Sequence, residues 1–322
     1  MLQSQPNGSQ ALIGNELVGS ELIGIDLGGT AIKLGRFSPA GELLAELNVA
    51  TPQPAVAGGV CMAIAEAVAT LDPEHRADRV GIGHPGPADA AGRVARIAIN
   101  LPGWVDVPLA DWLEPMLERR VTCGNDGNCA LLGEAHSGAA QGFGDVLLLT
   151  LGTGVGGGVL LGGQLFTGHR GAAAEPGLIG VDSDGEPCNS GNRGSLETLC
   201  SLRGLARLSP LPADDLCLRA DAGDAEALAV WQRYGILLGT GLSSLIYVLT
   251  PELILLGGGL SGASHHFLPA VWEQVNTRVQ AASREGLQIE RAQLGNGAGR
   301  LGAALLAAER LNGRLDATQQ LG

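Results

Sequence analysis

The sequence predicts an α/β protein whose two halves are built alike. Two segments, 22–37 and 145–165, each have the pattern of a strand, a glycine-rich turn and a second strand. Between and after them, stretches with apolar residues at helical spacing alternate with short apolar runs typical of buried strands. The chain has 322 residues, 45% of them hydrophobic, which is enough for about two domains with a large core. Only 3% are aromatic, so we expect an aliphatic core.

The first half is expected to open with three strands in an antiparallel meander, because they follow one another at short spacing. The elements predicted for this half are strands at 21–27, 31–37, 42–49, 79–83 and 120–123 and helices at 55–71 and 109–118. Residues 1–20 precede the first of these strands, and we expect them to form a loose tail.

The second half repeats the strand–turn–strand unit and then becomes largely helical. The elements predicted there are helices at 128–138, 224–249 and 298–311, strands at 145–151, 159–164 and 253–260, a glycine turn at 152–158 and a polar loop at 182–195. Glycine makes up 51 residues, which indicates many tight corners or close approach of the backbone to a ligand.

The composition excludes several classes of protein. The formal net charge is −13, so we expect neither nucleic-acid binding nor electrostatic binding to an anionic membrane. Lys33 is the only lysine and no Gly-Lys pair exists, which excludes the P-loop NTPases. The most apolar long segment, 235–249, is too short and interrupted for a membrane span, which needs ~20 apolar residues.

The expected location is the cytoplasm. A secretory signal would require basic residues near its start, but no basic residue precedes Lys33. The six cysteines include no Cys-x-x-Cys pair, and we expect free, buried thiols.

The turn Asp26-Leu27-Gly28-Gly29-Thr30 ends the first strand with a carboxylate. Its glycines allow backbone N–H groups to face a phosphate, while Asp26 could hold Mg²⁺ through water. An ordinary hairpin turn explains this segment equally well. Lys33 follows the turn by three residues, and strand alternation leaves the direction of its side chain open.

Two further glycine segments come at strand ends. The run 152–158 satisfies G-x-G-x-x-G, but a strand rather than a helix follows it, so a phosphate-facing hairpin is favoured over a Rossmann dinucleotide site. The run 257–259 would allow a flat ligand close to the backbone, or simply a close helix–strand contact.

The segment Asn125-Asp126-Gly127-Asn128 lies between a predicted strand and a predicted helix. Asn125 or Asp126 could be the N-cap of that helix. Alternatively, Asp126 is a carboxylate at the end of a strand, placed as a general base toward a hydroxyl group. A loop with an amide side chain, Asn100-Leu101-Pro102-Gly103-Trp104, lies upstream.

Eight segments in order carry a resemblance that none carries alone. They are Asp26-Leu-Gly-Gly-Thr30, Gly83-His-Pro-Gly86, Asn100-Leu-Pro-Gly-Trp104, Asn125-Asp-Gly-Asn128, Leu151-Gly-Thr-Gly-Val-Gly-Gly-Gly158, Glu175, Gly194-Ser-Leu-Glu197 and Leu256-Gly-Gly-Gly259. Together they resemble the ROK family (repressors, open reading frames and sugar kinases) of the actin-like ATPase superfamily. The resemblance implies two RNase H-like lobes with a cleft between them. It implies a smaller lobe over 21–124, onto which a C-terminal helix at about 298–312 packs, and a larger lobe over 125–297.

The resemblance also implies an activity: an ATP-dependent, glucokinase-like sugar kinase that phosphorylates glucose or a related hexose. Asp126 would be the general base, and Asp26 would hold Mg²⁺ through water. The residues implied to bind ATP are Asp26, Gly28, Gly29, Thr30, Gly152, Thr153, Gly154, Gly257, Gly258 and Gly259. Those implied to bind the sugar are Gly86, Asn100, Asn125, Asp126, Glu175 and Glu197. Family members are commonly homodimers or larger homo-oligomers, so this chain is expected to form a homodimer or a larger homo-oligomer.

The sequence departs from the family pattern in one loop. Many members bind a structural zinc ion there through three cysteines and a histidine; here the loop keeps only Cys188, with Ser190 and Ser195 at the other cysteine positions and Leu178 at the histidine position. Since a structural zinc site needs four Cys or His ligands, we expect no zinc. Hydrogen bonds from Ser190, Asn192 and Ser195, or packing, would then hold the loop. Because the family histidine usually also touches the sugar, Leu178 leaves the identity of the sugar open.

Two other functions were weighed. A sugar-sensing repressor of the same family carries an extra DNA-binding domain, for which the roughly 20 residues before the first strand leave no room. A sensor that has lost catalysis would be consistent with the missing zinc ligands. However, Asp26 and Asp126 are both present, which favours the kinase.

Overall fold

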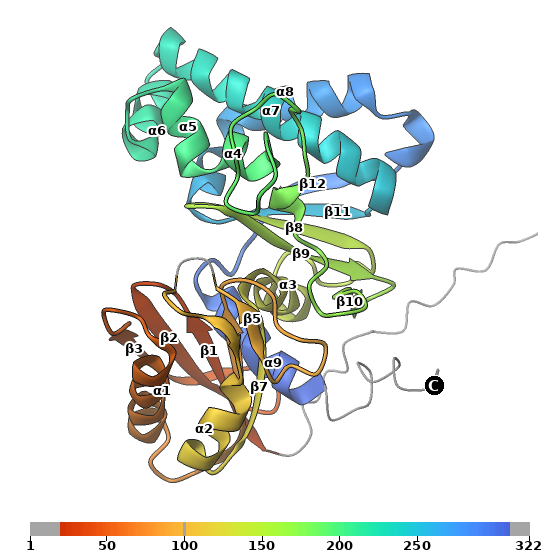
Figure 1. Ribbon diagram of the computed structural model, residues 1–322. Coiled ribbons are helices and arrows are strands. Elements are labelled where there is room, and N and C mark those ends of the chain that lie inside the picture. Colours follow the sequence, from red (N-terminus) through yellow and green to blue (C-terminus); the bar gives the residue numbers. More distant parts are fainter. Residues whose placement is uncertain (1–19, 99–100, 310–322) are drawn as a thin grey trace, which may run out of the picture.

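The computed structural model describes residues 20–98 and 101–309 and contains two five-stranded mixed sheets with the same topology (Figure 1). The strand orders are β3-β2-β1-β4-β7 and β10-β9-β8-β11-β12. In each sheet, three consecutive strands are antiparallel, and two later strands join the other side of the first in parallel. This confirms the prediction of two halves of similar construction.

The two sheets belong to separate lobes, which we call the first and second lobe. The strands of the first are β1 (Glu21–Leu27), β2 (Ala31–Phe37), β3 (Leu43–Ala50), β4 (Ala77–His84) and β7 (Arg120–Asn125), and β5 (Ala95–Ile97) and β6 (Val105–Val107) pair beside them. The strands of the second are β8 (Val146–Leu151), β9 (Val155–Leu161), β10 (Gln164–Leu165), β11 (Leu253–Gly257) and β12 (Gln288–Arg291).

The α-helices are α1 (Ala57–Leu71), α2 (Leu109–Leu117), α3 (Asp126–Ser137), α4 (Leu196–Cys200), α5 (Leu202–Leu208), α6 (Ala213–Asp221), α7 (Ala225–Leu249), α8 (Ser264–Arg278) and α9 (Gly297–Glu309). Three 3₁₀-helices are η1 (Pro176–Leu178), η2 (Gly259–Ala263) and η3 (Ala281–Ser283). None of the helices described here is both long and apolar enough to cross a membrane.

The predicted glycine turn at 152–158 was too long. Strand β9 already begins at Val155, and Gly157 pairs with Leu149 of β8. A Cβ atom at Gly157 would lie 2.1 Å from the carbonyl oxygen of Leu148 and 2.5 Å from Pro176. The glycine is therefore needed for close packing within a strand, a requirement that resembles a turn signal in sequence.

Helices α3 and α9 lie between the two sheets (Figure 1). The C-terminal helix α9 returns to the first lobe and packs on β1 and β4 as well as on α3. Gly24 and Gly81 are paired neighbours on these strands, and a Cβ atom at either would lie 1.7 Å from a carbonyl oxygen of α9. The helix thus lies directly on the backbone of the sheet, which accounts for part of the high glycine content.

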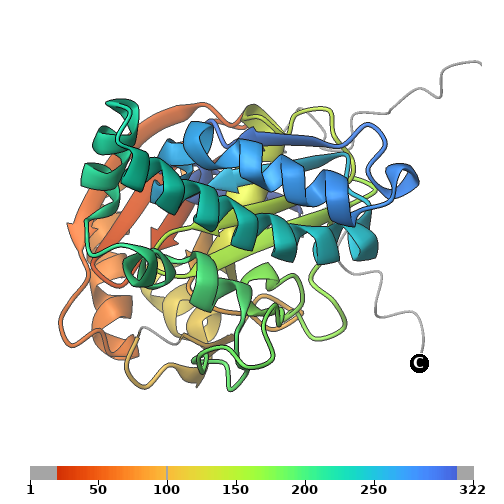
Figure 2. The same cartoon turned by 90° about the horizontal axis from the view of Figure 1, so that it is seen from above.

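The core departs from the aliphatic expectation in the second lobe. Helices α7 and α8 run side by side over its sheet (Figure 2). Trp231 and Tyr234 of α7 and Phe267 of α8 are fully buried, with ring centroids 5.1–5.9 Å apart. The Tyr234 hydroxyl donates a hydrogen bond of 2.7 Å to the carbonyl oxygen of Cys200. Three of the chain's ten aromatic residues thus meet where these two long helices pack together.

Candidate active site

A cavity of about 370 Å³ lies between the lobes. The end of β1 supplies Asp26 and the start of α3 supplies Asp126. The second lobe contributes the glycines 257–259 at the end of β11, and the start of α9 closes the cavity. The cavity therefore brings together two predicted carboxylates and one predicted nucleotide-binding segment.

The position of Asp126 follows from the way α3 begins. The Asn125 side chain accepts a hydrogen bond of 3.1 Å from the Asn128 N–H. Asn125 is therefore the N-cap of α3, as one of the two interpretations of this segment predicted. Asp126 becomes the first helical residue, and its Oδ1 accepts a bond of 2.8 Å from the Gly127 N–H. Burial raises the pKa of Asp126 to about 6, and the nearby Asp26 carboxylate adds to the increase.

Asp26 has a cationic partner that the sequence left undecided. Lys33 lies opposite Asp26 in the antiparallel register of β1 and β2, with its Nζ 3.5 Å from Asp26 Oδ2. The same Nζ donates a hydrogen bond of 3.2 Å to Asn296 Oδ1. Burial raises the pKa of Asp26, and Lys33 opposes part of this effect. The chain's only lysine is thus directed toward the cavity.

The residues around the start of α9 were not predicted as part of the site. Asn296 and Gly299 line the cavity, and a Cβ atom at Gly299 would lie 3.3 Å from Asp26 Cγ. The alternation Gly295-Asn-Gly297-Ala-Gly299 at the start of a predicted helix was the available signal, since such runs mark close backbone approach.

Hydrogen bonds fix the first glycine turn, residues 28–30. The Gly28 N–H donates to the Ala31 carbonyl oxygen at 2.9 Å, so this N–H is already used within the turn. Thr51 Oγ1 donates to the Gly28 carbonyl oxygen at 2.7 Å, and Gln53 Nε2 to that of Gly29 at 2.9 Å. Thr30, at the tip, is exposed. The turn is rigid where it approaches Asp26.

The two other glycine segments lie at strand ends of the second lobe. Gly152 donates its N–H to the Gly154 carbonyl oxygen at 3.0 Å, and Thr153 and Gly154 line a separate pocket of about 120 Å³. Gly258 has a φ of +78°, and a Cβ atom there would lie 2.3 Å from the Leu151 carbonyl oxygen. No other residue fits that position without displacing β8.

Glu175 and Glu197 are the two glutamates predicted to bind the sugar. Asn125 Nδ2 approaches Glu175 Oε1 at 3.5 Å. Burial raises the pKa of Glu175 to about 7, with Asp126 and Glu197 adding to the increase. Glu197 Oε2 accepts a hydrogen bond of 3.0 Å from the Val155 N–H and lines the pocket of Thr153. These predicted sugar ligands lie beside the large cavity rather than among the residues that line it.

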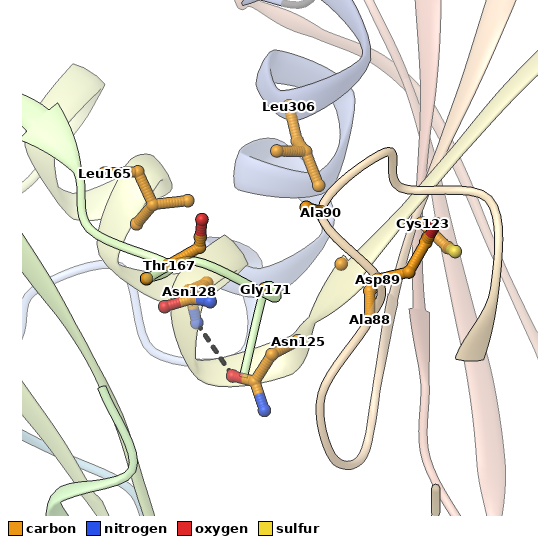
Figure 3. Close-up of a pocket in the computed structure, with 12 residues that line it drawn as sticks. Ala88, Asp89, Ala90, Cys123, Asn125, Asn128, Leu165, Thr167, Gly171 and Leu306 are labelled. Carbon is orange, nitrogen blue, oxygen red and sulfur yellow. Dashed lines mark hydrogen bonds between the residues drawn. The ribbon is translucent and has the colours of Figure 1, made fainter. Parts of the chain in front are cut away.

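A smaller hollow lies on the other side of the start of α3 (Figure 3). Its volume is about 70 Å³, and Asn125, Asn128, Thr167 and Gly171 are among its lining residues. Asn128 Oδ1 is buried there with no hydrogen-bond partner among the described residues. Asn125 therefore lies between this hollow and Glu175.

Two predicted sugar ligands remain, and Gly86 is not among the residues that line the cavity. Asn100 lies outside the described residues. Gly86 lies in the turn after β4 with a φ of +83°, and a Cβ atom there would lie 2.1 Å from the Ile97 carbonyl oxygen. That contact is a reason for glycine that does not depend on a ligand.

The loop around Cys188 is held by hydrogen bonds. Asn192 Nδ2 donates to the Leu178 carbonyl oxygen at 3.0 Å, and the Cys188 N–H donates to that of Asn192 at 2.7 Å. Ser195 caps α4 by accepting a bond of 3.3 Å from the Thr198 N–H. Hydrogen bonds of the expected kind are present at Asn192 and Ser195.

Comparison with known proteins agrees with the fold. The ROK family profile matches residues 22–310. A glucokinase from Thermotoga maritima is 34% identical over 307 residues, covering 89% of this chain and 97% of that enzyme. An N-acetyl-D-glucosamine kinase from Escherichia coli O157:H7 is 34% identical over 303 residues, covering 87% of this chain and 97% of its own.

Among solved structures, a ROK family glucokinase from Streptomyces griseus, in complex with glucose and AMPPNP, is 33% identical. It superposes with a TM-score of 0.78 and covers 90% of this chain and 99% of its own. With the family match over most of the sequence, this likeness shows that the chain belongs to the ROK family and that its two lobes form the actin-like ATPase fold.

Proposed function

We propose that the protein transfers the γ-phosphoryl group of Mg·ATP to a hydroxyl group of a hexose, glucose or a close relative, with Asp126 as the general base. The relatives named above are sugar kinases, and this chain is accordingly a carbohydrate kinase. The observation that carries the finer proposal is the single cavity that Asp26 and Asp126 share with the glycines 257–259. A sensor without catalysis would have no need of this pair.

Asp126 has the properties that a general base requires. Its carboxyl lines the cavity at the N-terminus of α3, where the helix dipole stabilises the ionised form. With a pKa of about 6, it is ionised at neutral pH yet basic enough to accept a proton from a hydroxyl group in the transition state. Asp126 would therefore take the proton as the sugar oxygen attacks phosphorus.

The donor set at Asp26 suits a hard cation. Mg²⁺ prefers oxygen ligands and is commonly held by one or two carboxylates together with substrate phosphates. Asp26 is a buried carboxylate with a raised pKa, so a nearby cation would relieve an unfavourable charge. When bound, Mg²⁺ would neutralise charge on the transferring phosphoryl group. Asp26 would orient the metal, and Lys33 would hold Asp26 in place.

The remaining predicted site residues are proposed in the same roles. The glycines 257–259 would flank adenosine, and the turns 28–30 and 152–154 would face the phosphates. Asn100, Asn125, Glu175 and Glu197 would read sugar hydroxyls. Closure of the lobes would exclude water, which would otherwise compete with the sugar. A homo-oligomer remains a prediction that sedimentation equilibrium would test.

The decisive experiment measures ADP release from Mg·ATP with glucose, mannose, N-acetylglucosamine, other amino sugars and pentoses. We expect turnover with a hexose, and a fall in kcat of ~10²–10⁴ in Asp126→Asn, because general-base catalysis contributes about that much. Asp78→Asn, at an exposed carboxylate on β4, is the matched control and should keep full activity. Near-normal turnover of Asp126→Asn would rule out the role of this residue. Absence of turnover with every sugar, while ATP still binds, would rule out the hexose proposal.

A further inference from the structure

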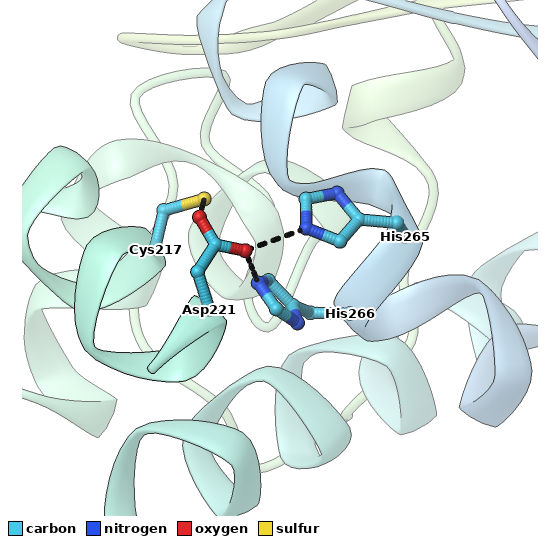
Figure 4. A group of neighbouring side chains, drawn as sticks. All are labelled: Cys217, Asp221, His265 and His266. Atoms are coloured by element: carbon cyan, nitrogen blue, oxygen red, sulfur yellow. Dashed lines mark hydrogen bonds and ion pairs between the residues drawn. The ribbon is translucent and has the colours of Figure 1, made fainter. Parts of the chain in front are cut away.

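Four side chains that the proposed function does not use converge on the surface of the second lobe. Cys217 and Asp221 lie one turn apart on α6, so they share a face of that helix. His265 and His266 lie in the first turn of α8. Figure 4 shows the four side chains directed toward one another. We propose that they form a binding site for a transition-metal ion, Zn²⁺ by preference, that joins α6 to the start of α8.

The distances suit a tetrahedral ion. Nε2 of His265 and of His266 lie 3.0 and 2.9 Å from Asp221 Oδ1, and Cys217 Sγ lies 4.0 Å from Asp221 Oδ2. One donor atom from each residue can be chosen so that all four lie within 4.8 Å of one another. Zinc bonds of about 2.0–2.3 Å in a tetrahedron place the donor atoms roughly 3.3–3.8 Å apart. Small rotations of the exposed Asp221 and His265 side chains would therefore complete the site.

The donor chemistry selects the metal. One thiolate, two imidazoles and one carboxylate make a mixed S, N and O set, which suits Zn²⁺ and excludes Mg²⁺ and Ca²⁺ as preferred ions. Binding would release the thiol proton of Cys217, because the thiolate is the ligand. Without a metal, burial together with Asp221 and Asp214 raises the pKa of this thiol, and a divalent cation would reverse that effect.

A simple pair of His–Asp salt bridges explains the arrangement less well. Both imidazoles lie in the first turn of α8, where the helix dipole disfavours a positively charged side chain. Their ring centroids are 3.9 Å apart, close enough for both imidazoles to bind one ion, whereas a salt bridge to Asp221 needs only one of them. His265 is 57% exposed, and exposed pairs contribute little stability.

The site differs from the loop in which we expect no zinc. That expectation concerned the loop around Cys188, which lacks its other ligands. The cluster on α6 and α8 lies elsewhere on the second lobe and draws on none of those positions. Helix α8 directly follows η2 and the glycines 257–259 of the cavity. A metal here would have a structural role, fixing the start of α8.

The test is titration of the metal-free, full-length protein with Co²⁺ and Zn²⁺. We expect one Co²⁺ per chain with a thiolate-to-cobalt charge-transfer band, and displacement of Co²⁺ by Zn²⁺. Zn²⁺ should also raise the thermal midpoint. Cys217→Ser should abolish the band, and the double variant His265→Gln/His266→Gln should weaken binding at least about 10–100-fold, the loss that even supporting residues of metal sites produce.

Two variants serve as controls, and circular dichroism establishes that each variant is folded. Cys188→Ser removes the remaining cysteine of the family's zinc loop, and His169→Gln removes an exposed histidine elsewhere. Both should bind Co²⁺ as the unaltered protein does. A band that survives Cys217→Ser, a band lost in Cys188→Ser, or a thermal response to Zn²⁺ equal in all variants would overturn the proposal.

Discussion

At Asp126, burial raises the pKa of the carboxyl from 3.8 to about 6. Between these two pH values the folded state binds more protons than the unfolded state, so the free energy of unfolding falls as pH rises through this window. At neutral pH the full penalty is present. Asp126→Asn should therefore raise the free energy of unfolding at pH 7 by about 1–2 kcal/mol, since each pKa unit is worth about 1.4 kcal/mol and partial exposure screens some of it.

Urea denaturation of both proteins at pH 7 and again near pH 3.5 measures this difference. The gain should shrink at the lower pH, where the carboxyl is neutral in the folded state and mostly neutral in the unfolded state. A variant that is less stable than the original at pH 7 would contradict the burial argument.

The same pKa sets the pH dependence of catalysis. A general base must be ionised, so kcat/KM should fall tenfold per pH unit below a midpoint near 6. The pKa of Glu175 is raised further, to about 7, so a second group titrates in the same region and the two carboxyls share the apparent values. The pH profile of the Glu175→Gln variant separates them: the acid limb near 6 should remain. Its disappearance would transfer the role of base to Glu175.

Local chain order was enough to predict that two carboxylates lie at strand ends. Asp26 lies at the end of β1 and Asp126 directly follows β7, and strand ends meet at a cleft in folds of this kind. Lys33 and Asn296 are different, because their bond joins residues 263 positions apart. The cross-strand register that turns Lys33 toward Asp26 depends on how β1 and β2 pair, which residue-by-residue alternation does not fix.

At the scale of elements, the contact of α9 with the first sheet depends on strand glycines, which have no side chain between the helix and the backbone of the sheet. A Cβ atom at Gly81 would lie 1.7 Å from the carbonyl oxygen of Ala303, which cannot move without moving the helix. Gly81→Ala should therefore lower the free energy of unfolding by about 3 kcal/mol or more, at or above the usual cost of overpacking.

Gly58→Ala in α1 is the matched control for that variant. A Cβ atom at Gly58 would meet nothing within 4 Å, so alanine should raise stability by about 0.5–1 kcal/mol through its better helix propensity. Urea midpoints of the two variants should consequently move in opposite directions. Equal shifts of the two urea midpoints would mean that α9 packs less closely on the sheet than the structure shows.

Two features were predicted poorly, helix α8 and the start of β9, and both depend on packing between segments distant in sequence. Helix α8 was not foreseen, because its first turn holds two histidines and Pro269 interrupts its pattern. Its stability comes instead from packing of Phe267 against Trp231 and Tyr234 of α7, a contact between distant segments. The start of β9 was misplaced because glycines required for packing look like turn residues.

At the scale of the molecule, the repeat of strand, glycine turn and strand predicted two halves of similar build, and their sheets share one strand order. The relation of the lobes was less accessible, since it depends on α3 and α9 crossing between the sheets. A Cβ atom at Gly302 would lie 1.6 Å from the carbonyl oxygen of Cys129, so these two helices meet backbone to backbone. Such contact is specified by the absence of side chains, and glycines in the sequence do not say which segment they will contact.

The return of α9 to β1 and β4 has a consequence for synthesis of the protein. The last strand of the first sheet is complete at Asn125, but the helix that covers one of its faces begins only at Gly297. While the ribosome makes the intervening chain, Gly24 and Gly81 have no helix to lie against. The first lobe must therefore wait for the last helix, and a nascent chain that stops short of α9 leaves an apolar sheet face open to chaperones and to aggregation.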